Sequence, residues 1–142
     1  MALPFTVSII VPTVRSNAFL HELLEKLKCY SPDEVEVIVL PDVHEMLSRC
    51  KVIATGSVGP GVKRDIGAEY AKGDILAFLD DDAYPTDGWL LHGLEPFKDP
   101  TVCAVAGPAV TPPQDPFWAR VSGAFYIAPF GGGRTDRYWP GK

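Results

Sequence analysis

The chain has 142 residues, of which 46% are hydrophobic and 22% charged, and its formal net charge is −5. These values are typical of one compact globular domain. The acidic excess argues against a nucleic-acid partner, because a protein that binds nucleic acid needs a basic face. Cys29, Cys50 and Cys103 have neither disulfide nor metal spacing, so we expect reduced thiols in a cytoplasmic protein. No window approaches the roughly 18 apolar residues of a membrane span, and no leader segment is expected.

Taken in chain order, short apolar runs alternate with segments of helical spacing. The predicted strands, closed by proline, glycine or acids, cover residues 6–12, 34–40, 51–55, 74–80 and 101–110. The predicted helices cover residues 17–30, 60–73 and 85–97, and Ser16 or Asn17 is the expected N-cap of the first. Such alternation is typical of an α/β fold, with a mostly parallel sheet covered by helices on both faces.

Polar residues follow several of the predicted strands. In open parallel sheets, ligands bind in the crevice beyond the carboxyl ends of the strands. The candidates at that edge are Pro12 and Thr13 with Arg15, then Asp42, the loop 56–64, and the triplet Asp80, Asp81 and Asp82.

The acidic triplet "DDD" begins at the last residue of the predicted strand 74–80. If the backbone stays extended, Asp80 and Asp82 share one side and Asp81 points away. Two carboxylates on one side repel unless a cation lies between them, and Mg²⁺ or Mn²⁺ prefers such oxygen ligands. We therefore predict half of a metal–phosphate site at Asp82 and Asp80. A solvated turn that leads into the next helix is the alternative, although an apolar strand rarely needs three acids to end.

The glycine-rich stretch "ATGSVGPGVKRD" precedes the second predicted helix. It lacks a complete phosphate-binding fingerprint, so a flexible connector is favoured over a phosphate cradle. Lys63 and Arg64 stand near the start of that helix, where the helix dipole favours acids, and this indicates a bound anion.

Together these pieces resemble the N-terminal half of a family-2 glycosyltransferase. The similar stretches are "VSIIVPT", "EVIVLPD" and, most specifically, "GPGVKRDIGAEYAKGDILAFLDDDAYPTDGWL". The resemblance covers about residues 6–110 and implies a Rossmann-like GT-A sandwich. It also implies transfer of a sugar from a nucleotide-sugar donor to a saccharide or lipid-linked acceptor, usually with inversion and with Mg²⁺ or Mn²⁺.

The resemblance also implies roles for individual residues. Pro12 and Thr13 would line the nucleotide pocket, Asp42 would meet the base or ribose, and Arg64 would lie near the base or diphosphate, while Arg15 is counted with the donor-binding residues. Asp80 would approach the ribose or sugar, Asp81 is counted with the donor-binding residues, and Asp82 would bind the metal. Val14 stands where the family commonly has an aromatic residue.

We expect residues 1–115 to form the nucleotide-sugar-binding domain and residues 116–142 to begin an acceptor-side region. The chain is expected to be truncated, with the general base past Lys142, because neither Asp115 nor Asp136 has a supporting motif. Residues 116–142 carry a net charge of +3 and seven aromatic side chains. One interpretation of this aromatic and basic segment is peripheral contact with a lipid-linked acceptor or with the inner face of a membrane. The favoured interpretation is that its aromatic side chains belong to a core layer left uncovered by the truncation.

Two other classes of function remain open. A nucleotidyltransferase would use the same paired acids and metal, but a loop rich in Gly, Arg and Lys is expected after its first strand, where this chain has "VPTVRSN". A non-catalytic module that binds a nucleotide or a partner is the other alternative. A phosphatase is disfavoured because its acids would follow the first strand.

Overall fold

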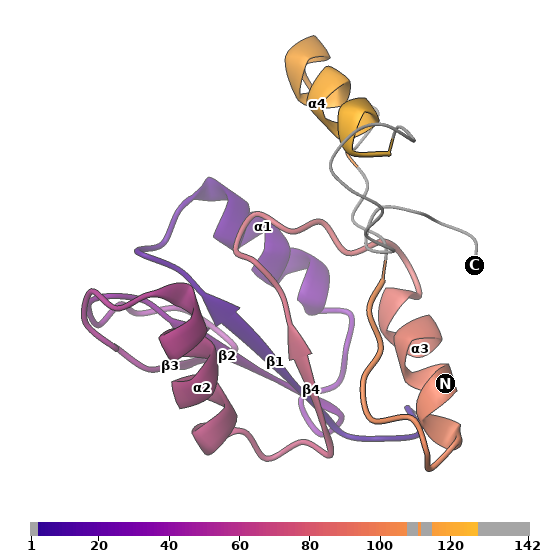
Figure 1. Cartoon of the computed structure of the whole chain (residues 1–142). Helices are drawn as coiled ribbons and strands as arrows, with labels where there is room; N and C mark the ends of the chain where they lie inside the picture. The colour runs from indigo at the N-terminus through magenta and orange to yellow at the C-terminus, as the bar shows by residue number, and fades with distance from the viewer. Residues whose placement is uncertain (1–2, 108–110, 112–114, 128–142) are drawn as a thin grey trace. The chain divides into compact units, whose positions relative to one another are not determined.

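The computed structural model describes residues 3–107, 111 and 115–127. It divides into two compact units, Met1–Trp89 and Leu90–Lys142, which are described separately. The first unit contains β1 (Val7–Pro12), α1 (Ala18–Leu27), β2 (Val35–Leu40), β3 (Lys51–Val52), α2 (Pro60–Tyr70) and β4 (Ile75–Phe78) (Figure 1). These units reflect packing, and the functional boundary predicted at residue 115 stays a prediction.

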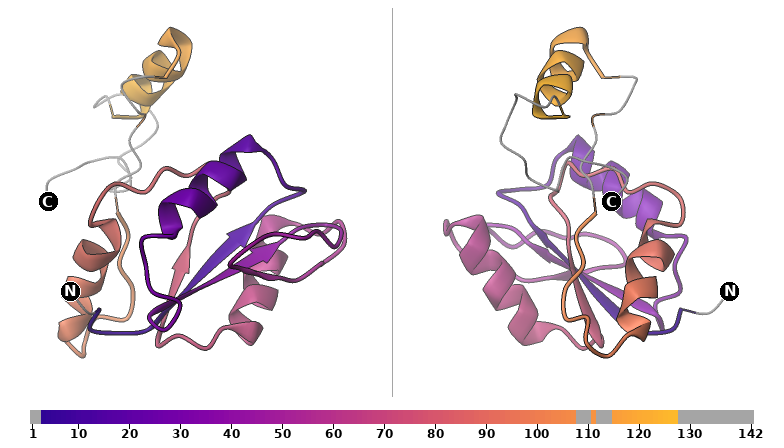
Figure 2. Two further views of the ribbon diagram at one scale, coloured as in Figure 1. Left: turned by 180° about the vertical axis from the view of Figure 1, so that it is seen from behind. Right: turned by 45° about the vertical axis from the view of Figure 1, so that its right-hand side comes forward.

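The four strands form one parallel sheet in the order β3-β2-β1-β4, which confirms the predicted α/β class. The chain moves from β1 to β2 in one direction and returns across the sheet from β3 to β4. Right-handed crossovers then place α1 and α2 on opposite faces, as the two sides of the sheet in Figures 1 and 2 show. The strand order reverses between β1 and β4, and the crevice at such a switch point is where α/β folds bind ligands.

The face under α2 holds a cluster of fully buried aliphatic side chains. Ile10, Ile38 and Leu40 form it, and partly buried Ile66 packs against it from α2. Gly67 lets the helix approach, because a Cβ there would lie 2.6 Å from Ile10 Cγ2. The sequence thus combines β-branched strands with a small residue at the point of closest helix contact.

The helix α1 buries one apolar stripe. Its buried residues Leu20, Leu23 and Leu27 recur at helical spacing. Asn17 is the N-cap, and its Oδ1 accepts a hydrogen bond of 2.9 Å from Leu20 N. Of the two predicted caps, Asn17 is therefore the one used.

Ser8 anchors the turn between α2 and β4 from inside the sheet. Its fully buried hydroxyl donates to Glu36 Oε1 at 2.5 Å and accepts from Gly73 N at 2.8 Å. The backbone N–H of Lys72 donates to the same Glu36 oxygen at 2.5 Å. Burial raises the pKa of Glu36, but these hydrogen bonds outweigh it and hold the pKa below its ordinary value.

This arrangement predicts acid sensitivity. Because the pKa of Glu36 is lower in the folded chain, its contribution to stability is present above about pH 4.5 and is lost as the pH falls through the folded pKa. Urea unfolding at neutral and acid pH should therefore show a shallower pH slope for Glu36→Gln than for wild type. Glu25→Gln, which removes the exposed partner of Lys28, is the matched control and should keep the wild-type slope. Equal slopes in wild type and Glu36→Gln would contradict the assignment.

Two strands are shorter than predicted. The third strand covers only Lys51–Val52, although backbone hydrogen bonds to the β2 side continue through Gly56, whose N–H donates to Asp42 O at 3.0 Å. The fourth strand ends at Phe78 and lies at the sheet edge. Its side chains alternate in burial, and Leu76 and Phe78 are exposed.

The helix α3 (Trp89–Leu94) begins at the last residue of the first unit, and the second unit holds the rest of it together with the 3-10 helix η1 (Glu95–Lys98) and α4 (Phe117–Ile127). A strand was predicted over residues 101–110. This prediction is wrong for residues 101–107, which form no strand, and residues 108–110 lie outside the described part. The helix α4 was not predicted, and it exposes Phe117 and Trp118. No helix within the described ranges is long and apolar enough to span a membrane.

Candidate functional site at the carboxyl edge of the sheet

The acidic triplet lies in a turn rather than in an extended strand. After β4 ends, Ala83 N donates to Asp80 O at 3.0 Å, which closes a turn over residues 80–83. The expected strand-like alternation of the three carboxylates is therefore wrong, because the backbone has left the extended conformation. Instead, each carboxylate has its own set of neighbours.

Asp81 holds the loop between β1 and α1. Its Oδ2 accepts hydrogen bonds from Thr13 Oγ1 at 2.6 Å and from Asn17 Nδ2 at 2.9 Å. The Thr13 hydroxyl also lies 2.9 Å from Arg15 O, and with one proton it can donate to only one of the two acceptors at a time. Thr13 is buried, so the charged acceptor stabilises a hydroxyl that water cannot reach. Asp81 thus joins the carboxyl end of β4 to that of β1.

Asp80 is paired with Arg64 from α2. Arg64 Nη2 lies 2.5 Å from Asp80 Oδ1, and both side chains are partly exposed. The two residues were predicted to lie near the donor, and the structure brings them together. Because the pair is accessible to water, we expect it to contribute little to folding stability and to remain available for exchange with a ligand.

Asp42 is paired with the neighbouring cation Lys63. The Lys63 ammonium is buried and lies 2.5 Å from Asp42 Oδ1. The sequence interpretation of a bound anion is therefore corrected for Lys63, which is buried against a carboxylate of this chain, and it stays a prediction for the partly exposed Arg64. Neither pairing was predicted, since Asp42 and Asp80 lie 21 and 16 positions from these cations.

Two predicted residues remain open to solvent at this edge. Asp82 is exposed, and within residues 3–107, 111 and 115–127 its side chain makes no hydrogen bond or ion pair. The Arg15 side chain is likewise exposed and unpaired within the described part, whereas Pro12 is buried as the last residue of β1. The free oxygens of Asp82 are the feature through which this edge could accept a ligand.

The donor set agrees with a hard divalent cation. Such a cation commonly takes only one or two protein carboxylates and fills its remaining positions with water and substrate phosphates. No group of three or more His, Cys, Asp or Glu side chains within the described residues could hold a metal by itself. Asp82 is unengaged and Asp80 is held only by an exposed ion pair, so these two residues could hold a metal together with a phosphate ligand.

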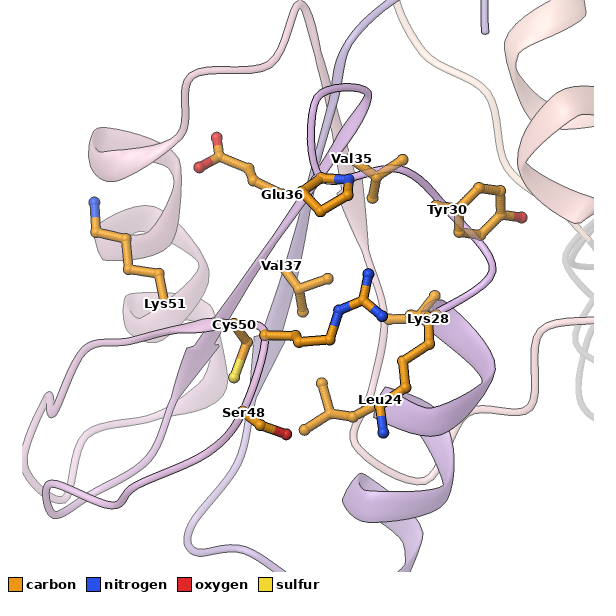
Figure 3. A pocket seen from close by; sticks show the side chains of 12 residues that line it. Leu24, Lys28, Tyr30, Val35, Glu36, Val37, Ser48, Cys50 and Lys51 are labelled. Atoms are coloured by element: carbon orange, nitrogen blue, oxygen red, sulfur yellow. The ribbon is translucent and has the colours of Figure 1, made fainter. Parts of the chain in front are cut away.

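A separate pocket of about 270 Å³ lies between α1 and the amino-terminal half of β2. Leu24 and Val37 line it, while Glu36 and Lys51 turn away from Leu24 in the close view (Figure 3). Cys50 also lines it, and burial raises the pKa of its thiol. Because Val35 and Val37 come early in β2, this pocket is distinct from the carboxyl edge that gathers the polar side chains.

Comparison with known proteins identifies relatives of this chain. The model of the family described as glycosyl transferase family 2 matches residues 8–142. The putative glycosyltransferase EpsH of Bacillus subtilis is 32% identical over 88 residues, which cover 54% of this chain and 26% of EpsH. The chain therefore spans about a quarter of the length of that relative.

Solved structures share the fold. TarS 1–349 of Staphylococcus aureus in complex with UDP-GlcNAc is 25% identical with a TM-score of 0.52, and the match covers 64% of this chain and 31% of TarS. The mannosyltransferase PcManGT from Pyrobaculum calidifontis, in complex with GDP-Man and Mn²⁺, has a TM-score of 0.62 at 22% identity, covering 85% and 41% of the two chains. With the parallel sheet and the family match, the chain belongs to glycosyl transferase family 2 and has the GT-A fold.

Proposed function

We propose that the first unit binds a nucleotide-sugar donor at the carboxyl ends of β1, β2 and β4 for transfer of the sugar to an acceptor hydroxyl. The observation that carries this proposal is the acidic turn. Asp81 is used to fix the loop and Asp80 faces Arg64, while Asp82 is left exposed at the switch point of the sheet. The TarS structure, which holds UDP-GlcNAc, supports a nucleotide-sugar as the donor.

The residues have separate proposed tasks. Asp82, with Asp80, would hold Mg²⁺ or Mn²⁺ on the donor diphosphate, and a bound metal neutralises the negative charge that develops on the leaving diphosphate. Asp42 would accept a hydrogen bond from the base or ribose, while Lys63 holds its Oδ1. Arg64 would release the Asp80 carboxylate and bind a donor phosphate in its place, because their ion pair is partly exposed.

The acceptor is proposed to be a saccharide or a lipid-linked saccharide. TarS is named a poly(ribitol-phosphate) β-N-acetylglucosaminyltransferase, and the matching TarS sequence is 29% identical to this chain over 92 residues. The general base is still predicted to lie past Lys142, and contact of residues 116–142 with a membrane surface is likewise a prediction. The test of function is therefore donor binding rather than turnover.

Calorimetric titration with UDP-, GDP- and dTDP-sugars, with and without Mn²⁺, tests the proposal. We expect one nucleotide class to bind in a Mn²⁺-dependent manner. Replacement of Asp82 by alanine should weaken that binding on the order of a hundredfold or more, because even outer-shell partners of a metal contribute tenfold to a hundredfold.

Asp33→Ala is the matched control, because Asp33 is also exposed but precedes β2, at the other edge of the sheet. This variant should bind the donor as wild type does. If none of the tested nucleotide-sugars binds, the proposal is refuted. Mn²⁺-dependent binding that survives unchanged in Asp82→Ala would refute the assigned role of that carboxylate.

A further inference from the structure

Lys63 is a buried cation whose three ammonium protons all have acceptors. Its Nζ lies 2.5 Å from Thr13 O, 3.2 Å from Leu40 O and 2.5 Å from Asp42 Oδ1. The side chain is only 3% exposed. A buried ammonium costs free energy unless it is paired and hydrogen-bonded, and here both conditions are met.

The three acceptors come from the ends of two neighbouring strands. Leu40 ends β2, Thr13 follows β1, and Thr13 N donates to Leu40 O at 3.1 Å, so the β1–β2 ladder continues to this point. Lys63 reaches both from the first turn of α2. Lys63 therefore fixes the position of the first turn of α2 relative to the carboxyl ends of β1 and β2, and it also fixes the orientation of the Asp42 carboxylate.

The contacts of Lys63 continue into the acidic turn. Lys63 binds the Thr13 carbonyl oxygen, and the Thr13 hydroxyl donates to Asp81. One connected chain of polar contacts thus runs from Asp42 beyond β2, through Thr13 beyond β1, to Asp81 beyond β4. A change at Lys63 acts on both ends of the edge at which the donor is proposed to bind.

We propose that Lys63 is a positioning residue that sets nucleoside selectivity by orienting Asp42. This inference rests on the proposed function. With Oδ1 held by Lys63, the plane of the Asp42 carboxylate is fixed, so its other oxygen presents its lone pairs to the nucleoside in one direction. Bases that present an N–H group along that direction are favoured, and bases that place it elsewhere would leave the second oxygen of the partly exposed Asp42 carboxylate unpaired beneath the bound nucleoside.

The test measures the Kd values of UDP and GDP with Mn²⁺ by calorimetry, for wild type, Lys63→Met and Lys63→Gln. Lys63→Met removes every donor, whereas Lys63→Gln keeps two N–H groups and provides a folded variant if the methionine is not tolerated. We expect Kd for the preferred nucleotide to rise on the order of tenfold, the loss of one hydrogen bond to a charged group. We also expect the ratio of the two Kd values to move toward one, which a merely structural loss would not produce.

A double-mutant cycle with Asp42→Asn separates orientation of Asp42 from an independent effect. If Lys63 acts through Asp42, the double variant should bind no more weakly than the weaker single variant. Lys51→Met is the control for net charge, because Lys51 lies over the Tyr70 ring and contacts neither strand end. It should keep the wild-type Kd values and their ratio.

The outcomes separate the two proposals. If wild type binds neither nucleotide nor any nucleotide-sugar, the proposed function fails and this inference fails with it. If wild type binds while both Lys63 variants keep its Kd values and their ratio, only the role of Lys63 is overturned. Fully additive effects of Lys63→Gln and Asp42→Asn would also overturn it.

Discussion

Replacement of Gly73 by alanine is expected to lower the free energy of unfolding by about 3 kcal/mol, at the upper end of what overpacking usually costs. A Cβ at this position would lie 2.5 Å from Ser8 N and 2.6 Å from Val7 C. These are backbone atoms of β1, which pairs with β2 on one side and β4 on the other, so they cannot move aside without disturbing the sheet. The Gly73 N–H bond to Ser8 Oγ would be displaced as well.

Urea unfolding of Gly73→Ala beside Gly61→Ala measures this effect. Gly61 stands in the first turn of α2, and no atom lies within 4 Å of the position that a Cβ would take there. Alanine at Gly61 should therefore stabilise the helix by about 0.5 to 1 kcal/mol. We therefore expect Gly73→Ala to lower the free energy of unfolding and Gly61→Ala to raise it. A Gly73→Ala protein as stable as wild type would show that the turn before β4 can lift away from β1.

Replacement of Asp81 by alanine is expected to cost about 2 kcal/mol of folding stability, because it removes a charged acceptor that serves two hydrogen-bond donors. The donors are the buried Thr13 hydroxyl and the Asn17 amide, at 2.6 and 2.9 Å. Donor affinity should fall in addition, since the loop after β1 loses its contact with the acidic turn. Chemical unfolding and calorimetric titration of the same variant measure the two effects.

Asp82→Ala is the matched control for this effect on stability. Its carboxylate has no partner within the described residues, so its removal should leave the unfolding free energy nearly unchanged while donor binding is strongly weakened. Asp81→Asn, which keeps one acceptor oxygen, should lie between Asp81→Ala and wild type in stability. If Asp81→Ala and Asp82→Ala had the same stability, the proposed division of tasks within the triplet would be wrong.

The sequence predicted those features that depend on neighbouring residues. The strands expected over 6–12 and 34–40 differ from Val7–Pro12 and Val35–Leu40 by one residue at the start, because β-branched runs and proline act locally. The run at 101–107 is equally apolar but forms no strand. Composition supplies an apolar surface, whereas a strand also needs a neighbour for its backbone hydrogen bonds.

The contacts of the site depend on residues far apart along the chain. Asp81 meets Thr13 and Asn17 across 68 and 64 positions, and no local spacing reveals such a contact. Parallel topology did place their backbones at one edge, so the candidates were found although their partners were not. For Lys63 a signal existed, because a cation within a helix that packs on a sheet requires a counter-charge, and Asp42 was the acid already expected at that edge.

The position of β4 has a consequence for self-association. Within the described residues β4 is an edge strand, which presents unpaired backbone groups to a second chain, and the exposed Leu76 and Phe78 would add apolar contact to such a pairing. The strand is only four residues long and is followed, after Leu79, by Asp80 to Asp82. A second copy aligned in parallel along this edge would bring two acidic turns together, where like charges repel. The carboxylates proposed to gather the donor thus also disfavour parallel pairing of this strand with a second copy.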